Sequence, residues 1–139
     1  MAEFVFRALA AEQGRAGCFE VASAATSREE IGNPIYPDAL RCLQRHGVAV
    51  SRHAARQVTR ADYDGYDRLV LMDRHNVRNL RGIIPDDPDG KVSLLLEHVD
   101  PSLLGRDSLD VADPWYTRDF EAAYDDILLG CRALLEELS

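Results

Sequence analysis

The apolar run "RLVLMD" (residues 68–73) decides the fold of this chain. It is continuous, ends in an acid, Asp73, and is matched by a second run of the same character, "KVSLLLEH" (residues 91–98). Such runs are typical of strands that are buried on both faces of a parallel sheet. A third strand is expected at "CFEVASAA" (residues 18–25), which mixes aromatic and β-branched residues and leads into a polar stretch.

Helical patterns surround these strands. "PDALRCLQRHG" (residues 37–47) begins with proline, places Leu40 and Leu43 three residues apart and ends in glycine, so it predicts a helix. A long apolar stripe from Phe120 onward predicts a C-terminal helix. Thr59-x-x-Asp62 has the spacing of a capping box for a short helix.

The first fourteen residues, "MAEFVFRALAAEQG", also predict a helix. Apolar residues recur four positions apart, and Gly14 stands where the helix would stop. Strands that alternate with helices predict one three-layer α/β domain over residues 1–139, with right-handed crossovers and sites at the carboxyl ends of the strands. A helix with no strand before it is half of a βα unit, so we expect that a strand is missing at the amino end.

Composition narrows the class of protein. The chain of 139 residues has 24 Asp and Glu against 16 Lys and Arg, a formal charge of -8. This charge argues against a nucleic-acid surface or an anionic membrane as the main partner. No apolar run approaches the roughly 20 residues that a membrane span needs. With no signal peptide before the first helix, we expect a cytoplasmic protein.

Cysteine and histidine give no sign of a metal centre at this stage. Three cysteines are an odd and scattered set, which predicts reduced thiols. Neither they nor the four histidines are expected to fall at paired ligand spacings, so we expect no metal and no cofactor. The residues concerned are Cys18, Cys42, Cys131, His46, His53, His75 and His98.

Five stretches together resemble the low-molecular-weight protein tyrosine phosphatase family, in order and over essentially the whole chain. They are "SAATSREEIGNP" (23–34), "LQRHGV" (43–48), "HAARQVT" (53–59), "LVLMDRHNVRNL" (69–80) and "ADPWYTRDFEAAYDDI" (112–127). The resemblance implies a flavodoxin-like parallel sheet of four strands in the order 2-1-3-4. The match begins at Met1, so the first, central strand and the Cys-x5-Arg phosphate loop that follows it in the family are expected to be absent here.

The resemblance implies phosphotyrosine monoester hydrolysis through a cysteinyl-phosphate intermediate. That chemistry needs a thiolate of lowered pKa and an arginine in the phosphate loop, and an acid that protonates the leaving phenolate. Asp113 of "DPWY" matches the acid. None of the three cysteines is followed, after five intervening residues, by an arginine. We therefore expect the chain as written to be inactive.

Other site residues follow from the same resemblance. Trp115 and Tyr116 would form an aromatic wall of the substrate pocket, and Glu29 stands where the family usually has an aromatic side chain at the pocket mouth. Ser23 and His53 match residues that support the phosphate loop. Asp73 matches a structural acid without a catalytic role.

Two readings of function remain open. The favoured one is a truncated phosphatase whose full-length form would act on a phosphotyrosine protein or a small aryl phosphate. The alternative is a non-catalytic pseudophosphatase that binds partners or oligomerises. The thiol-dependent arsenate reductases of the same fold are disfavoured, because they use further cysteines and not the acid of "DPWY".

A missing central strand would leave two strand edges unpaired. We expect the gap to be closed in one of three ways. The strands at 18–25 and 68–73 pair directly, "EFVFRALA" (residues 3–10) is drawn in as a strand, or two chains form a homo-oligomer through these edges.

Overall fold

The computed structural model describes residues 1–27, 32, 35–51, 54–112 and 119–138. Helices surround two strands, and the β1–α4–β2 unit alternates as the sequence predicts. The elements are α1 (Ala2–Glu12), the 3-10 helix η1 (Ala16–Cys18), α2 (Pro37–Arg45), α3 (Arg60–Gly65), β1 (Leu69–Leu71), α4 (Arg74–Arg81), β2 (Val92–Leu94), the 3-10 helix η2 (Leu95–His98), α5 (Pro101–Leu104) and α7 (Phe120–Glu137).

A parallel pair of strands forms the centre of the fold. β1 and β2 run parallel, with Leu69 opposite Val92 and Leu71 opposite Leu94. Side chains of β1 alternate between two hydrophobic clusters, because Val70 packs against the larger cluster while Leu69 and Leu71 belong to the smaller one. The strand thus has a hydrophobic cluster against each face and a parallel partner, which confirms the α/β class and the prediction of a strand from "RLVLMD".

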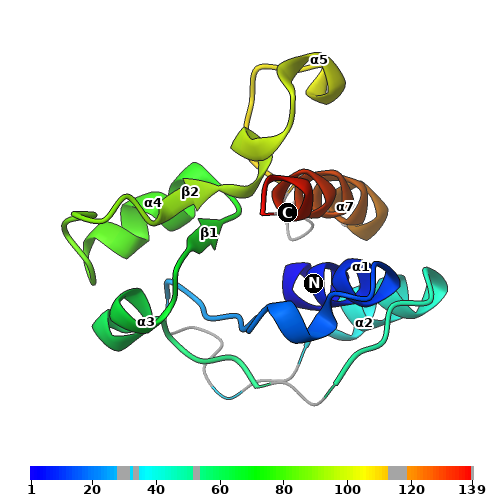
Figure 1. Cartoon of the computed structure of the whole chain (residues 1–139), viewed down its shortest axis with the longest axis horizontal. Helices are drawn as coiled ribbons and strands as arrows, with labels where there is room; N and C mark the ends of the chain where they lie inside the picture. The colour runs from blue at the N-terminus through cyan, green and yellow to red at the C-terminus, as the bar shows by residue number, and fades with distance from the viewer. Residues whose placement is uncertain (28–31, 33–34, 52–53, 113–118, 139) are drawn as a thin grey trace.

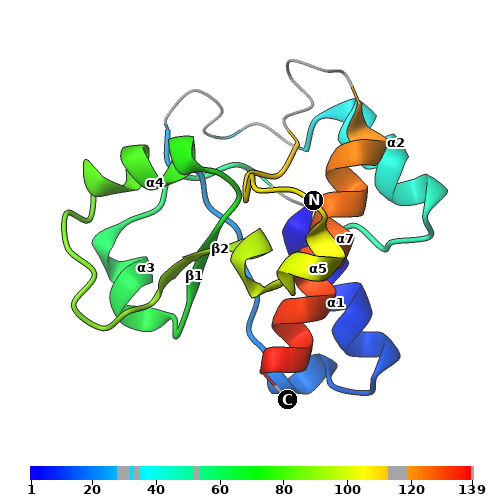
Figure 2. The ribbon, with the colours of Figure 1, turned by 90° about the horizontal axis from the view of Figure 1, so that it is seen from above.

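Helices cover the two faces of this pair (Figures 1 and 2). The smaller cluster lies under α3 and α4 and is centred on Tyr63 and Leu80. The larger cluster joins α1, α2, η2 and α7, which bury the fully enclosed side chains of Val5, Leu43 and Leu135. α1 and α7 lie side by side, so the two ends of the described chain pack on the same face of the sheet.

The expected strand at 91–98 is wrong in its second half. Only Val92–Leu94 pairs with β1, and Leu95–His98 form η2. The Glu97 carboxylate accepts a hydrogen bond from the backbone N–H of Leu94, which turns the chain where β1 ends. As a result Leu95 and Leu96 point into the larger cluster instead of continuing the sheet.

The expected strand at 18–25 is wrong as well. Residues 16–18 form η1, and within the described residues only Ala25 joins a ladder, as an isolated parallel bridge to Gln57. Side chains of α1 bond to this extended segment in place of a neighbouring strand. The Arg7 guanidinium donates to the carbonyl of Val21, and the Ser23 hydroxyl donates to the Glu3 carboxylate at 2.8 Å.

Two of the three expected ways of closing the sheet are therefore wrong. "EFVFRALA" lies in α1 and is helical, and in the described residues β1 pairs with β2, not with the 18–25 segment. A homo-oligomer through strand edges stays a prediction. No helix in the described part of the chain has both the length and the apolar character needed to cross a membrane.

Asp87 organises the turn that leads into β2. Its carboxylate accepts from the Tyr63 hydroxyl (2.6 Å) and from the backbone N–H groups of Lys91 (2.8 Å) and Val92 (3.1 Å). The hydrogen bond from Tyr63, followed by those from the backbone, holds the pKa of Asp87 below its usual range. The folded state therefore stabilises the ionised Asp87 carboxylate more than the unfolded state does.

We predict an acid-dependent effect of Asp87→Asn. The stabilisation by Asp87 is fully present above its unfolded pKa of about 3.9 and is lost as the pH falls through the lower pKa of the folded state. The variant should therefore unfold at a lower urea concentration than the wild type at pH 7, and the difference should shrink towards pH 3. Asp86→Asn, at the exposed neighbouring position, is the control. An equal difference at both pH values would contradict the prediction.

Candidate active site

The chain passes directly from the carboxyl end of β1 into α4. Asp73 is the N-cap of α4, and its carboxylate accepts from the backbone N–H of Asn76 at 2.8 Å. In return, Oδ1 of Asn76 accepts hydrogen bonds from the backbone N–H groups of Met72 (3.1 Å) and Asp73 (3.3 Å). These contacts fix the exit from β1 and agree with the structural role expected for Asp73.

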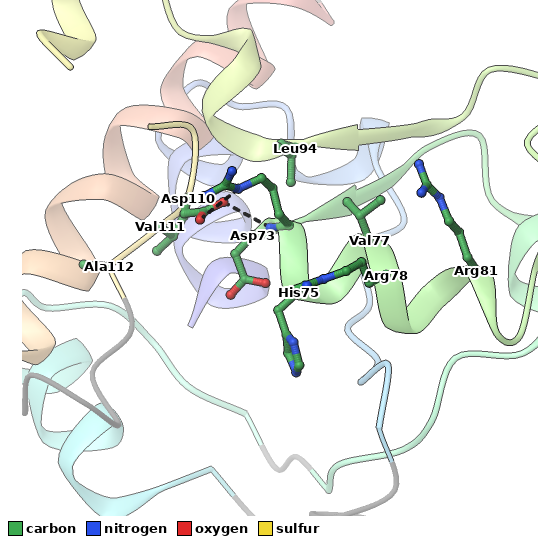
Figure 3. A pocket seen from close by; sticks show the side chains of 10 residues that line it. Asp73, His75, Val77, Arg78, Arg81, Leu94, Asp110, Val111 and Ala112 are labelled. Carbon is green, nitrogen blue, oxygen red and sulfur yellow. Dashed lines mark hydrogen bonds and ion pairs between the residues drawn. The ribbon is translucent and has the colours of Figure 1, made fainter. Parts of the chain in front are cut away.

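A pocket of about 900 Å³ opens at this edge of the sheet (Figure 3). Its walls combine one face of α4, the end of β2 and the segment that approaches Asp113. Arg74, Arg78 and Arg81 recur along α4 with helical spacing, so three arginines belong to the lining despite the net negative charge of the chain. The full lining is Asp73, Arg74, His75, Val77, Arg78, Arg81, Leu94, Asp110, Val111 and Ala112.

The segment that enters the pocket from α5 is anchored to β1. The backbone N–H of Val111 donates to the carbonyl of Met72 at 2.9 Å. One residue earlier, the Asp110 carboxylate accepts from the backbone N–H of Arg74 at 3.0 Å and lies 3.5 Å from its guanidinium Nε. The chain is therefore held beside the carboxyl end of β1 just before Asp113.

A second anchor comes from α7. Asp126 accepts two hydrogen bonds from the Arg106 guanidinium, at 3.1 and 2.9 Å, and one from the backbone N–H of Ala112 at 2.9 Å. Arg106 also donates to the carbonyl of Asp110 at 3.0 Å. This bidentate pair closes the loop after α5 onto the first turns of α7.

Most of the site residues named from sequence lie outside the described residues. These are Glu29, His53, Asp113, Trp115 and Tyr116. Ser23 is described, bonded to Glu3 of α1, and is not part of the pocket lining. The roles assigned to these six residues stay predictions. Asp73, which was expected as a structural acid, is described and does line the pocket.

Apart from Asp73, sequence reasoning did not single out the residues that build the described part of the site. The three arginines of α4 were visible as a repeat at positions i, i+4 and i+7. Asp110 and Asp126 had no such signal, because their partners lie 36 and 20 residues away.

Comparison with known proteins identifies the family. A model of the low molecular weight phosphotyrosine protein phosphatases matches residues 1–139. The chain belongs to this family. It is 36% identical over 138 residues to the low molecular weight protein-tyrosine-phosphatase YfkJ of Bacillus subtilis, covering 99% of this chain and 86% of that protein. It is 38% identical over 140 residues to the human low molecular weight phosphotyrosine protein phosphatase, covering 99% and 85%.

Solved structures agree with the fold of this phosphatase-family chain. The crystal structure of Bacillus subtilis YfkJ superposes with a TM-score of 0.90 at 34% identity, over 99% of this chain and 84% of that one. The resemblance inferred from sequence is thus confirmed. These alignments cover 99% of this chain and 85–86% of the two relatives, and the expected truncation stays a prediction.

Proposed function

We propose that this phosphatase-family fold serves phosphotyrosine monoester hydrolysis with Asp113 as the acid and base of the reaction. The observation that supports this role is the pair of anchors on the preceding residues. Val111 is bonded to Met72 at the end of β1 and Ala112 to Asp126 of α7. Both anchors hold the residues that directly precede Asp113 in the sequence at the sheet edge where sites of parallel α/β folds form.

Each proposed role has a chemical reason. A carboxylic acid at position 113 would give its proton to the leaving phenolate oxygen and then, as carboxylate, take one from the hydrolytic water. Trp115 and Tyr116 would pack against the aryl ring of the substrate. Ser23 and His53 would hold the loop that binds the phosphate, and Glu29 would lie at the pocket mouth.

Charge in the described pocket favours a phosphate-bearing ligand. The lining includes three arginines, Arg74, Arg78 and Arg81, and two aspartates, Asp73 and Asp110. Of these, Arg74 lies beside the Asp110 carboxylate, with Nε at 3.5 Å. Arginine side chains attract a phosphate dianion as it approaches. This supports a phosphotyrosine protein, or a small aryl phosphate, as the substrate class.

The nucleophile is the second part of the proposal. This mechanism requires a cysteine thiolate and an arginine in one phosphate-binding loop. The sequence holds no Cys-x5-Arg. Burial raises the pKa of Cys42 to about 11 and that of Cys131 to about 12, which leaves both thiols protonated at neutral pH. We therefore propose that these 139 residues alone do not turn over phosphotyrosine.

We predict that the chain gains phosphatase activity only when a phosphate loop is supplied. The 139-residue chain should release no p-nitrophenol from p-nitrophenyl phosphate. The same chain extended before Met1 by an apolar strand and a Cys-x5-Arg-Ser-Pro loop should turn over. Asp113→Asn in the extended chain should lower kcat by about 10²–10⁴-fold, the usual contribution of a general acid.

Matched variants separate the possible results. Asp107→Asn changes an exposed acid of the same loop and should leave kcat unchanged, and serine in place of the added cysteine should abolish turnover. Turnover by the unextended chain would overturn the proposed inactivity. A folded extended chain without activity would overturn the phosphatase proposal and favour a non-catalytic binding module.

A further inference from the structure

Three side chains with metal-ligand chemistry meet where α2 packs against the start of α7. Cys42 lies in the last turn of α2, His46 is the C-cap of that helix four residues later, and Glu121 is the second residue of α7. The sulfur of Cys42 lies 3.5 Å from Glu121 Oε1, and Nε2 of His46 lies 2.6 Å from Glu121 Oε2. All three donor atoms lie within 4.8 Å of one another.

The expectation that no cysteine or histidine falls at a paired ligand spacing is wrong for this pair. Residues four apart on a helix project from the same face. Cys42 and His46 have that spacing, and the pattern could have been read from the sequence. Glu121, 75 residues further along the chain, could not have been placed beside them without the fold.

The surrounding side chains hold the three donors in position. Cys42 is fully buried, so its sulfur has little freedom to move. The imidazole of His46 stacks on the ring of Tyr124, with centroids 3.8 Å apart and planes at 10°. Glu121 Oε1 accepts from the Arg45 guanidinium at 2.7 and 3.1 Å, which leaves Oε2 directed at His46.

The donor set suits a borderline-soft divalent ion. Thiolate, imidazole and carboxylate are the three ligand types that Zn²⁺ takes, with bonds of about 2.0–2.3 Å. We propose that Cys42, His46 and Glu121 form a Zn²⁺ site that joins α2 to the first turn of α7, with water as the fourth ligand. On binding, the Cys42 thiol releases its proton to the buffer, and the proton between His46 Nε2 and Glu121 moves to Nδ1 or to the buffer. The sulfur, the imidazole nitrogen and the carboxylate oxygen then each replace a water of the hydrated ion.

Arg45 is expected to weaken binding of the metal ion, so its substitution should strengthen that binding, whereas substitution of a ligand should weaken it. The Arg45 guanidinium forms an ion pair with the Glu121 carboxylate, which is one of the proposed metal ligands. Its positive charge therefore repels an incoming cation. Arg45→Gln should therefore tighten metal binding, although it removes an ion pair from the metal-free protein. A purely structural role for the cluster predicts no such gain.

The test uses Co²⁺ as a spectroscopic substitute for Zn²⁺ on the reduced 139-residue chain. A Cys18→Ser background removes the exposed thiol. We expect one equivalent of Co²⁺ to produce a thiolate-to-cobalt charge-transfer band that Zn²⁺ displaces. Cys42→Ser should abolish the band, whereas Cys131→Ser, at the other buried thiol, should leave it unchanged.

Exposed positions provide variants that are not expected to disturb folding. His46→Gln and Glu121→Gln should each weaken Co²⁺ binding at least 10-fold, while His75→Gln and Glu136→Gln, at exposed residues of α4 and α7, should not. Circular dichroism checks that each variant is folded. The proposal is overturned if no band appears, if the band survives Cys42→Ser, or if the His46 and Glu121 variants bind as tightly as their controls.

Discussion

Gly130→Ala is expected to lower the free energy of unfolding by about 2 kcal/mol, although alanine is the better helix former by about 1 kcal/mol. Gly130 lies in α7 and faces η2. A methyl group built there would lie 2.9 Å and 3.1 Å from the two terminal carbons of Leu95 and still closer to its Cγ. Such contacts are well inside normal carbon–carbon separations.

Leu95 has no room to yield. It is 1% exposed and belongs to the larger hydrophobic cluster, so its side chain cannot rotate away without displacing other buried groups. Overpacking of a core typically costs 1–3 kcal/mol and occasionally more. The cost of the clash therefore exceeds the gain in helix propensity, and α7 would have to move away from η2.

Urea unfolding at pH 7 measures this effect. Gly65→Ala is the matched control, because Gly65 lies in α3 with nothing within 4 Å of an added methyl group. It should be neutral or slightly stabilising. The double variant Gly130→Ala/Leu95→Ala should lose at least about 1 kcal/mol less than the sum of the single variants, since the shortened Leu95 side chain relieves the clash. Additive losses, or a Gly130→Ala protein as stable as the wild type, would refute this account.

Local signals predicted the helices of this fold well. Proline at the start of α2, the Thr59/Asp62 capping box of α3 and the apolar stripe of α7 each act within a few residues. Strands were predicted less well, because a strand exists only where a partner is in register. Residues 18–25 are extended in character but have only the Ala25 bridge, and residues 95–98 leave the sheet where β1 ends.

The candidate site was predictable only in part. The family resemblance, carried by stretches such as "DPWY", named Asp113 and its neighbours as catalytic and substrate-binding residues. Physical reasoning on the sequence could not find the anchors of that segment, because the contact between Val111 and Met72 and the contact between Ala112 and Asp126 join distant parts of the chain. The Cys42–His46 pair had a readable spacing, but its meaning depended on Glu121.

Asp126→Ala is expected to cost about 2 kcal/mol of stability and to loosen the chain just before Asp113. The Asp126 side chain is only 12% exposed and satisfies both the Arg106 guanidinium and the backbone N–H of Ala112. Hydrogen bonds to a charged group contribute roughly 1.5–3 kcal/mol each. The expected loss is smaller than the sum of these contributions, because the Arg106 side chain is 40% exposed and solvent screens its ion pair. Without the carboxylate, the loop after α5 loses its tie to α7 and keeps the one to β1.

Hydrogen exchange distinguishes this local role from a general loss of stability. The amide of Ala112 should exchange much faster in Asp126→Ala than in the wild type, because its acceptor is removed. Amides in the middle of α1 should change only by the amount that the lower global stability dictates. Asp125→Ala alters the adjacent exposed acid of α7 and should leave Ala112 protected. If Ala112 exchanges at the wild-type rate in Asp126→Ala, then Asp126 does not anchor the segment and the support for placing Asp113 at the pocket is lost.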